Sequence, residues 1–439
     1  MSQTKAQLID TLVASLLPAS DSSVDIGSNG VRFANIYGDT LYGDGSNLTG
    51  ITSTTINTNA DNRVITGSGT ANTLNGESSL LFDGSMLTVN DVRVGKGANS
   101  VSTNCVVGTE TLVGSVSGTH NTALGNRTLN ALTSGAENTA AGFNAGAAIT
   151  TGSYNVSVGR SSHGNLTTGS RNTAIGWKTQ LFNQTSNDNT AVGYQALYNV
   201  TGSNNTAIGA HSLDANHSGG YNNAVGQNAL GANTTGNYNV AMGQDALANN
   251  TTANNNVGIG RSALVTNTTG TQNTAIGALA LDASTTAGSN TAVGYSSLSA
   301  NTSGTRNSAF GDAALVANTT GSDNSSFGGF SLSVNTTGAQ NTACGGYSLN
   351  KNTTANANTA VGYLSLFENT TGTRNTAVGV DSLDSNTTGQ GNTALGFESL
   401  DAASTANYNT CVGDSSMSST TTGGQNTAIG QASLFSNTT

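Results

Sequence analysis

Residues 375–391 read N-T-A-V-G-V-D-S-L-D-S-N-T-T-G-Q-G, and this segment decides the fold because the chain repeats it. The consensus is N-T-A-[IVL]-G-x-x-[AS]-L-x-x-N-T-T-G-x-x, in which x is variable. The step between copies is 17 residues, except for one step of 16 between Asn189 and Asn205. The first Asn stands at 104, 121, 138, 155, 172, 189, 205, 222, 239, 256, 273, 290, 307, 324, 341, 358, 375, 392, 409 and 426. A fixed period over most of a chain is typical of a repeat or solenoid architecture.

We number the positions of each repeat 1 to 17 from that Asn. Seventeen residues with two Gly and only two obligatory large apolar positions, 4 and 9, form no 3.6-residue stripe, so the repeat is not helical. We expect Asn at position 1 and Asn-Thr-Thr at positions 12–14 to stack from turn to turn as hydrogen-bonded ladders. Gly at positions 5 and 15 is expected to adopt positive φ in tight turns. Representative ladder residues are Asn172, Gly176, Asn205, Gly209, Asn273, Gly277, Asn375 and Gly379.

The apolar positions predict which side chains fill the coil. Positions 4 and 9 are expected to point inward, and the Ala at position 3 to lie on the opposite face of a short strand as a subunit contact. Two large apolar side chains per turn make a thin interior, which would bury little surface against its ordering entropy. The sequence therefore predicts an all-β, elongated β-solenoid or β-roll that associates as a homotrimer, either as three parallel rolls or as one shared β-prism. At a rise of roughly 4.8 Å per turn, the array would be on the order of 90–100 Å long.

The position of the array divides the chain into three expected regions. Residues 5–17 place Ile9, Val13 and Leu16 on one helical face, and Pro18 follows, so we expect a short N-terminal helix. The expected regions are residues 1–20 for docking or assembly, 21–103 as a small β connector, and 104–439 as the repeat array.

Within the connector, Asp83-Gly84 separates two apolar runs and predicts a hairpin turn. The sequence stops fourteen residues into its last repeat. We therefore expect that a capping unit is missing, through processing, truncation or a longer parent chain.

Composition restricts the function classes. Only 8% of residues are charged, and the net charge is −10 with 13 scattered Lys and Arg, which argues against nucleic acid or an anionic membrane surface as a partner. No segment is apolar and long enough to span a bilayer. Cys105, Cys344 and Cys411 form no metal-ligand spacing and are interpreted as buried small residues. We expect no cofactor.

The repeats resemble those of a known group of proteins. Segments such as N-T-A-I-G at 172–176, A-L at 229–230 and N-T-T-G at 233–236 resemble the repeats of bacteriophage tail-fibre and related virion-fibre proteins. Residues 22–50 resemble N-terminal parts of marine phage structural proteins. The strand motif is also similar to the head repeats of trimeric autotransporter adhesins, whose coils are shorter. The self-cleaving chaperone domain of many phage fibres, and the secretion signal and membrane anchor of the autotransporters, have no counterpart here.

Two surface groups are candidate sites. Asp381, Asp384, Glu398 and Asp401 fall at positions 7 and 10 of adjacent repeats and would suit a hard cation or a carboxylate pair, or would simply be solvent-facing variable residues. Aromatic side chains at position 6 could stack on the sugar rings of a host glycan, or pack at turns or between subunits. These are Trp177, Tyr194, Tyr295 and Tyr363. The four His residues have no Ser, Cys or Asp partner at a repeated spacing, so no catalytic residues are predicted.

The resulting hypothesis is a structural fibre on a phage-like virion. Stacked turns would give reach, an N-terminal segment would join a virion attachment protein, and several weak contacts would hold a host-surface glycan or protein by avidity. The alternative is a bacterial or extracellular surface adhesin or filament. Remoter alternatives are a polysaccharide-degrading β-helix enzyme and an ice-binding solenoid. We expect a non-enzymatic protein at a virion surface or, in the alternative, at a cell surface.

Overall fold

The computed structural model describes residues 63–67, 74–82, 86–97 and 101–438. Contacts divide the chain into two units, and the unit made of residues 60–66 and 75–439 contains all of the repeats. The account below concerns that unit. The predicted helix at 5–17 and the docking segment 1–20 lie outside the described residues.

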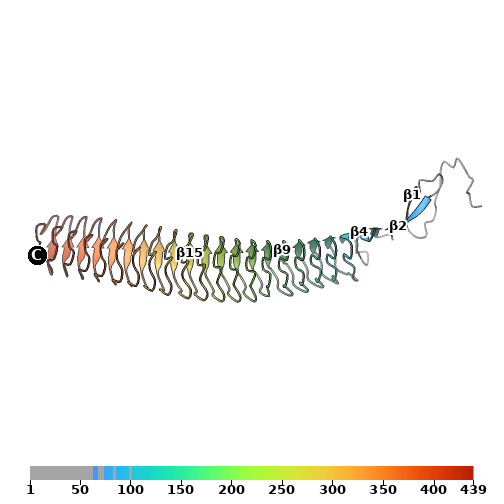
Figure 1. Cartoon of the computed structure of the whole chain (residues 1–439), viewed down its shortest axis with the longest axis horizontal. Helices are drawn as coiled ribbons and strands as arrows, with labels where there is room; N and C mark the ends of the chain where they lie inside the picture. Colours follow the sequence, from blue (N-terminus) through green and yellow to red (C-terminus); the bar gives the residue numbers. More distant parts are fainter. Residues whose placement is uncertain (1–62, 68–73, 83–85, 98–100, 439) are drawn as a thin grey trace, which may run out of the picture. The chain divides into compact units, whose positions relative to one another are not determined.

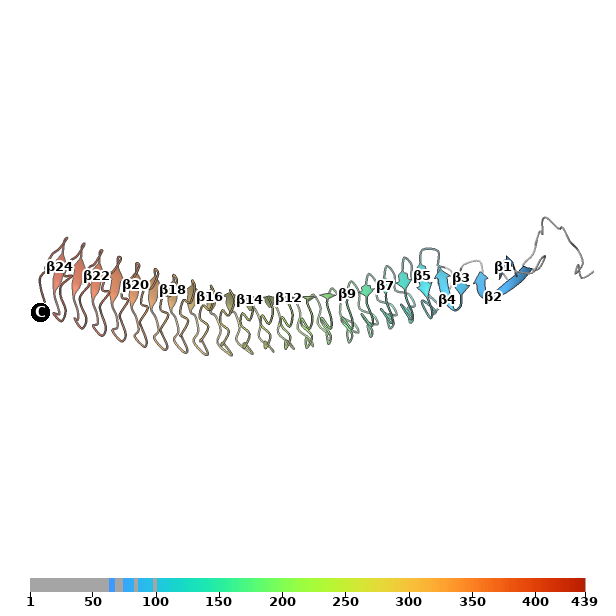
Figure 2. The same cartoon turned by 45° about the horizontal axis from the view of Figure 1, so that its top comes forward.

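The repeats form one parallel β-solenoid, as predicted, with no helix in the described ranges. Each repeat contributes one short strand, and each strand pairs in parallel and in register with the strands of the turns before and after it, for example Ala207 with Ala224. Figures 1 and 2 show these strands stacked along one axis. The twenty strands are β5 Cys105–Gly108, β6 Thr122–Leu124, β7 Thr139–Ala141, β8 Val156–Val158, β9 Thr173–Ile175, β10 Thr190–Val192, β11 Thr206–Ile208, β12 Asn223–Val225, β13 Val240–Met242, β14 Val257–Ile259, β15 Thr274–Ile276, β16 Thr291–Val293, β17 Ser308–Phe310, β18 Ser325–Phe327, β19 Thr342–Cys344, β20 Thr359–Val361, β21 Thr376–Val378, β22 Thr393–Leu395, β23 Thr410–Val412 and β24 Thr427–Ile429.

An antiparallel meander precedes the first coil. Its strands are β2 Leu74–Phe82, β3 Met86–Val89 and β4 Val92–Gly95, and a further strand, β1 Arg63–Gly67, pairs with β2. Strands β2 and β3 pair antiparallel, which confirms the predicted hairpin, whereas its turn residues Asp83 and Gly84 lie outside the described residues. Strand β4 then pairs antiparallel with β5 and so covers the edge that the first coil would otherwise leave open.

The predicted direction of the strand side chains is wrong. The Ala at position 3 points inward and is fully buried in nearly every turn, while the apolar side chain at position 4 points outward, as Ile175 does with 39% of its surface exposed. The reason is the width of the coil. A methyl group at Gly258, which stands at position 3, would already lie 3.1 Å from Leu247 Cγ, so the position favours small side chains and is Ala in most turns.

The interior is a row of Leu side chains with small residues around it. Leu at position 9 is fully buried, as in Leu230 and Leu281, which confirms its predicted inward direction. Position 12 changes along the array: it is apolar in the early turns, for example Leu132 and Ile149, and Asn in most turns from Asn216 onward.

Two Asn rows lie beside the Leu row and confirm the predicted ladders. At position 1, Asn222 Nδ2 donates to Gly236 O of its own turn (2.8 Å), and its Oδ1 accepts the backbone N–H of Asn239 in the next turn (3.0 Å). At position 12, Asn250 Nδ2 donates to Asn233 Oδ1 (2.9 Å). The Thr hydroxyls at position 13 bond the following turn, whereas the Thr side chains at position 14 mostly face solvent. The named ladder residues Asn172, Asn205, Asn273 and Asn375 are all buried in the first of these rows.

The two glycines of the repeat have different roles. At position 5, Gly176, Gly209, Gly277 and Gly379 adopt positive φ between 130° and 142°, as predicted. The expectation is wrong at position 15, where φ is not in that region. There a Cβ would overlap the carbonyl group of the next turn, so glycine is favoured for close stacking. Isolated Ala residues, such as Ala253, still occur at this position.

Two of the three cysteines are not buried. Cys105 and Cys344 stand at the outward positions 2 and 4 and are exposed, which corrects the expectation for them. Cys411 stands at position 3 and is buried, and burial raises the pKa of its thiol to about 12.

Candidate functional site

The acidic residues are brought together by the turn-to-turn register. Asp384 and Asp401 stand at position 10 of successive turns, with Asp381 and Glu398 at position 7 of the same turns. Burial first, and then the neighbouring carboxylates, raise the pKa of Asp384 to about 6, and its Oδ1 is buried without a partner. The pKa of Asp401 is raised for the same causes. In the part of the chain that the structure describes, no group of three or more His, Cys, Asp or Glu is placed to hold a metal ion. Cation binding here stays a prediction.

The four candidate aromatic residues are exposed, but only two of them meet. The rings of Trp177 and Tyr194, on adjacent turns, lie 5.4 Å apart between centroids. The guanidinium of Arg160 and the ammonium of Lys178 lie 6.0 Å and 5.5 Å from the Trp177 ring centre. These two cations and two rings form a basic aromatic strip.

Tyr295 and Tyr363 stand apart from that strip. Each has more than half of its surface exposed, and each lies on a distant turn of the array. Tyr363 meets Tyr347 of the preceding turn at 6.2 Å between ring centres. The sequence-predicted aromatic set is therefore several separate patches and not one surface.

The one short turn opens a hollow that the sequence analysis did not name. In the turn 189–204 the residue of position 14 is absent, so Thr201 at position 13 is followed directly by Gly202. A hollow lies over this place and spans three turns, and we call it the short-turn hollow. It is lined by Phe182, Gln184, Thr185, Asn199, Thr201, Ala215 and His217.

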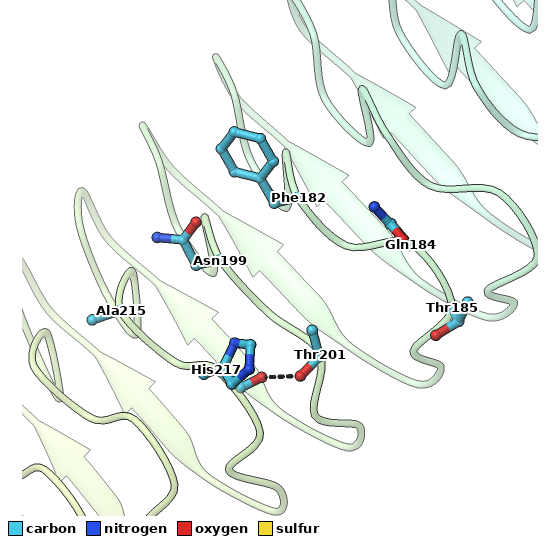
Figure 3. A pocket seen from close by; sticks show the side chains of 7 residues that line it. All are labelled: Phe182, Gln184, Thr185, Asn199, Thr201, Ala215 and His217. Atoms are coloured by element: carbon cyan, nitrogen blue, oxygen red, sulfur yellow. Dashed lines mark hydrogen bonds between the residues drawn. The ribbon is translucent and has the colours of Figure 1, made fainter.

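Figure 3 shows how the lining is arranged. Phe182, Asn199 and Ala215 stand at position 11 of the three turns and follow one another along the stack. Thr201 and His217, both at position 13, lie in a second row, and the Thr201 hydroxyl donates to His217 O. The hollow is the groove between these two rows. The signal that could have found it is the single 16-residue step.

Backbone pairing is broken at the same place. Position 13 of one turn normally donates its N–H to position 13 of the next, as Thr167 does to Gln184 O (2.8 Å) and Thr201 to His217 O (2.6 Å). Among the described residues, the corresponding bond from Gln184 to Thr201 is absent, as it also is from Thr285 to Thr302. The N–H of Gln184 and the carbonyl of Thr201 are therefore unpaired beside the hollow in the described structure.

A buried polar network replaces the Leu row in the two turns before the short one. His163 and Gln180 stand at position 9, with His163 Nδ1 2.7 Å from Ser157 Oγ and its Nε2 3.2 Å from Gln180 Oε1. Asn183 Nδ2 donates to the same Gln180 oxygen (2.9 Å). Burial lowers the pKa of His163 to about 4. The Ser–His pair is closed to solvent, so it satisfies polar groups inside the coil and has no access to a substrate.

The geometry defines the class of the molecule: it is a parallel β-solenoid protein with an outward apolar row, exposed aromatic patches and a hollow in its side. Comparison with protein-family models, with curated protein sequences and with solved structures found no match. In the described ranges, no helix is long and apolar enough to cross a membrane.

Proposed function

We propose that the chain forms the shaft of a homotrimeric fibre on a phage-like virion and contributes to host-surface attachment. The observation that carries this proposal is the outward row at position 4. The row is apolar in every turn of the array, whereas the outward position 2 is polar in most turns and position 6 varies freely. Its members are Val107, Leu124, Ala141, Val158, Ile175, Val192, Ile208, Val225, Met242, Ile259, Ile276, Val293, Phe310, Phe327, Cys344, Val361, Val378, Leu395, Val412 and Ile429.

The row is large enough to hold subunits together. Its side chains are half-exposed or exposed throughout, and Phe310 and Phe327 already stack within it at 5.0 Å. At about 70 Å² per turn the row presents on the order of 1,400 Å² per chain. A trimer divides this between two neighbours, roughly 700 Å² each, which is close to the roughly 800 Å² per partner of a standard interface. A continuous exposed apolar surface of this size marks an interaction site. Three parallel copies with these rows facing a common axis would cover it along the whole array, in place of the position-3 contact expected from the sequence.

The remaining exposed side chains suit attachment better than catalysis. The aromatic patches, such as Trp177 with Tyr194, lie outside the position-4 row and are repeated three times in a trimer. Weak contacts to a host-surface glycan or protein would add by avidity. The proposal assigns no catalytic residue and no cofactor, and it places the junction with the virion at the N-terminal segment.

Immunogold electron microscopy tests the location. Antibodies raised against the solenoid should label fibres that project from virus particles produced by infected cells. Label restricted to the envelope of uninfected cells would instead support the alternative, a bacterial or extracellular adhesin or filament.

A further inference from the structure

The short-turn hollow is the one place where the regular side of the coil is interrupted by a missing residue. We propose that it binds an uncharged sugar unit, as a receptor site for a neutral glycan. The biological meaning of the inference rests on the proposed attachment function, whereas the binding itself can be measured separately.

An aromatic ring forms one wall of the hollow. Phe182 is 43% exposed, and Tyr198 packs against its ring almost at a right angle, with 5.1 Å between centroids. This contact holds the ring in place while leaving much of it open. The C–H groups of a pyranose ring, which are weakly positive, stack on the negative face of such a ring.

The other walls carry polar groups that are not committed elsewhere. The side chains of Gln184, Thr185, Asn199 and His217 are exposed, and within the described structure none of them has a hydrogen-bond partner. Amide and hydroxyl groups both donate and accept, as sugar hydroxyls do. An aromatic wall with a few convergent polar groups is the composition expected of a small-molecule site.

Charge selects among possible sugars. The residues that line the hollow include no carboxylate, ammonium or guanidinium group. The basic aromatic strip differs, because Arg160 and Lys178 flank its Trp177 ring. A glycan unit with a carboxylate would be attracted to the strip, whereas the hollow has no permanently charged cation to pair with it. The hollow is therefore assigned to a neutral unit.

Saturation-transfer NMR with methyl glycosides tests the assignment. The probes are the methyl glycosides of glucose, galactose, mannose and N-acetylglucosamine, with glucuronic acid as the charged comparison. We expect at least one neutral glycoside to bind the full-length protein more tightly than glucuronic acid does. Phe182→Ala should weaken that binding about tenfold or more.

A second variant fills the hollow without removing any lining residue. Insertion of one threonine between Thr201 and Gly202 restores the 17-residue turn and should also abolish binding. Val334→Ala is the matched control, since it shortens an exposed apolar side chain at the same repeat position as Phe182 on a distant turn, and it should leave binding of the neutral glycoside unchanged. Unchanged circular dichroism would show that each variant keeps the fold.

The outcomes separate this inference from the proposed function. Absence of binding by all four neutral glycosides, or binding that survives both Phe182→Ala and the insertion, overturns the assignment. Stronger binding of glucuronic acid at the hollow does so too. Glycoside binding that depends on Phe182 would support the site. If antibodies against the same protein labelled neither virus particles nor cell surfaces, the attachment function would be contradicted.

Discussion

Two unpaired buried oxygen atoms mark the points where the inner Asn row is interrupted. Asn267 Oδ1 and Asn386 Oδ1 have no hydrogen-bond partner. In each case the next turn carries a residue other than Asn at position 12, namely Ser284 and Ala403. The hydroxyl of Ser284 is itself unpaired. A buried polar group without a partner costs about 1–3 kcal/mol, so these are weak points of the coil.

Restoring the row should therefore stabilise the protein. Ser284→Asn would place an amide beside Asn267 Oδ1 in a space that neighbouring turns already use for Asn. We expect the free energy of unfolding to rise by about 1–2 kcal/mol in urea titrations. Ser303→Asn, at the exposed position 14, is the control and should change it by less than about 0.5 kcal/mol. Equal effects of the two substitutions would contradict the ladder explanation.

The acidic cluster makes the stability of the folded chain depend on pH. The folded-state pKa of Asp384 is about 6, above the ordinary value of 3.8, so the folded chain binds this proton more tightly than the unfolded chain. The resulting stability is fully present below about pH 4 and is lost as the pH rises through 6.

Asp384→Asn should remove the loss of stability that occurs as the pH rises through 6. Because Asp384 is only partly buried, we expect the variant to be more stable than the native chain by only about 1 kcal/mol at pH 7. The difference should disappear or reverse near pH 4. Thermal unfolding across this pH range measures it, and a constant difference at all pH values would show that carboxylate repulsion is not the cause.

At the scale of the single turn, the burial of a side chain, and not its residue type, decides how much it contributes to the stability of the protein. Leu364 and Leu366 lie in the same turn, both with positive φ, but Leu366 at position 9 is fully buried and Leu364 at position 7 is half-exposed. The pair therefore separates the effect of the interior from that of the Leu side chain itself.

Leu366→Ala should lower the free energy of unfolding by about 2–5 kcal/mol, since it leaves a cavity in the Leu row. Leu364→Ala should cost less than about 1.5 kcal/mol, because part of its surface already meets water. Chemical denaturation of the two variants checks the difference. Similar losses would mean that position 9 is not the main source of apolar burial.

The repeat predicted the 17-residue turn of the solenoid but not which side chains of its strand point inward. The 17-residue period and the polar rows at positions 1 and 12 were readable because identical residues stack at a fixed rise. Alternation along a three-residue strand gives two faces without stating which is inside. Hydrophobicity suggested that the large residue at position 4, Ile175 or its equivalents, points inward, whereas the space left by Leu at position 9 favours a small residue, usually Ala, at position 3.

The sequence indicated some candidate sites better than others. The register of the repeat correctly brought Trp177 next to Tyr194 and Asp384 next to Asp401. The short-turn hollow could not be foreseen from residue chemistry, because its lining residues, such as Phe182 and His217, come from different turns. Only the 16-residue step between Asn189 and Asn205 indicated that the side of the coil would be interrupted there.

At the scale of the molecule, the position-4 row links fold to proposed function. A thin coil with a Leu row and polar ladders still leaves an apolar side chain exposed in each turn, and association would remove this surface from water. An acidic residue in the row would bury an unpaired charge in every subunit of the assembly, which is strongly unfavourable. Ile276→Asp combined with Phe310→Asp should therefore separate the subunits without disturbing the interior of the coil.

The mass of the native, unheated protein in solution, measured by light scattering, tests the central claim most directly. We expect three times the chain mass for the native protein and for Val334→Asp, an exposed apolar residue outside the row. The double variant Ile276→Asp, Phe310→Asp should have the mass of a single chain. A native protein that is monomeric, or a double variant that stays trimeric, would contradict the account.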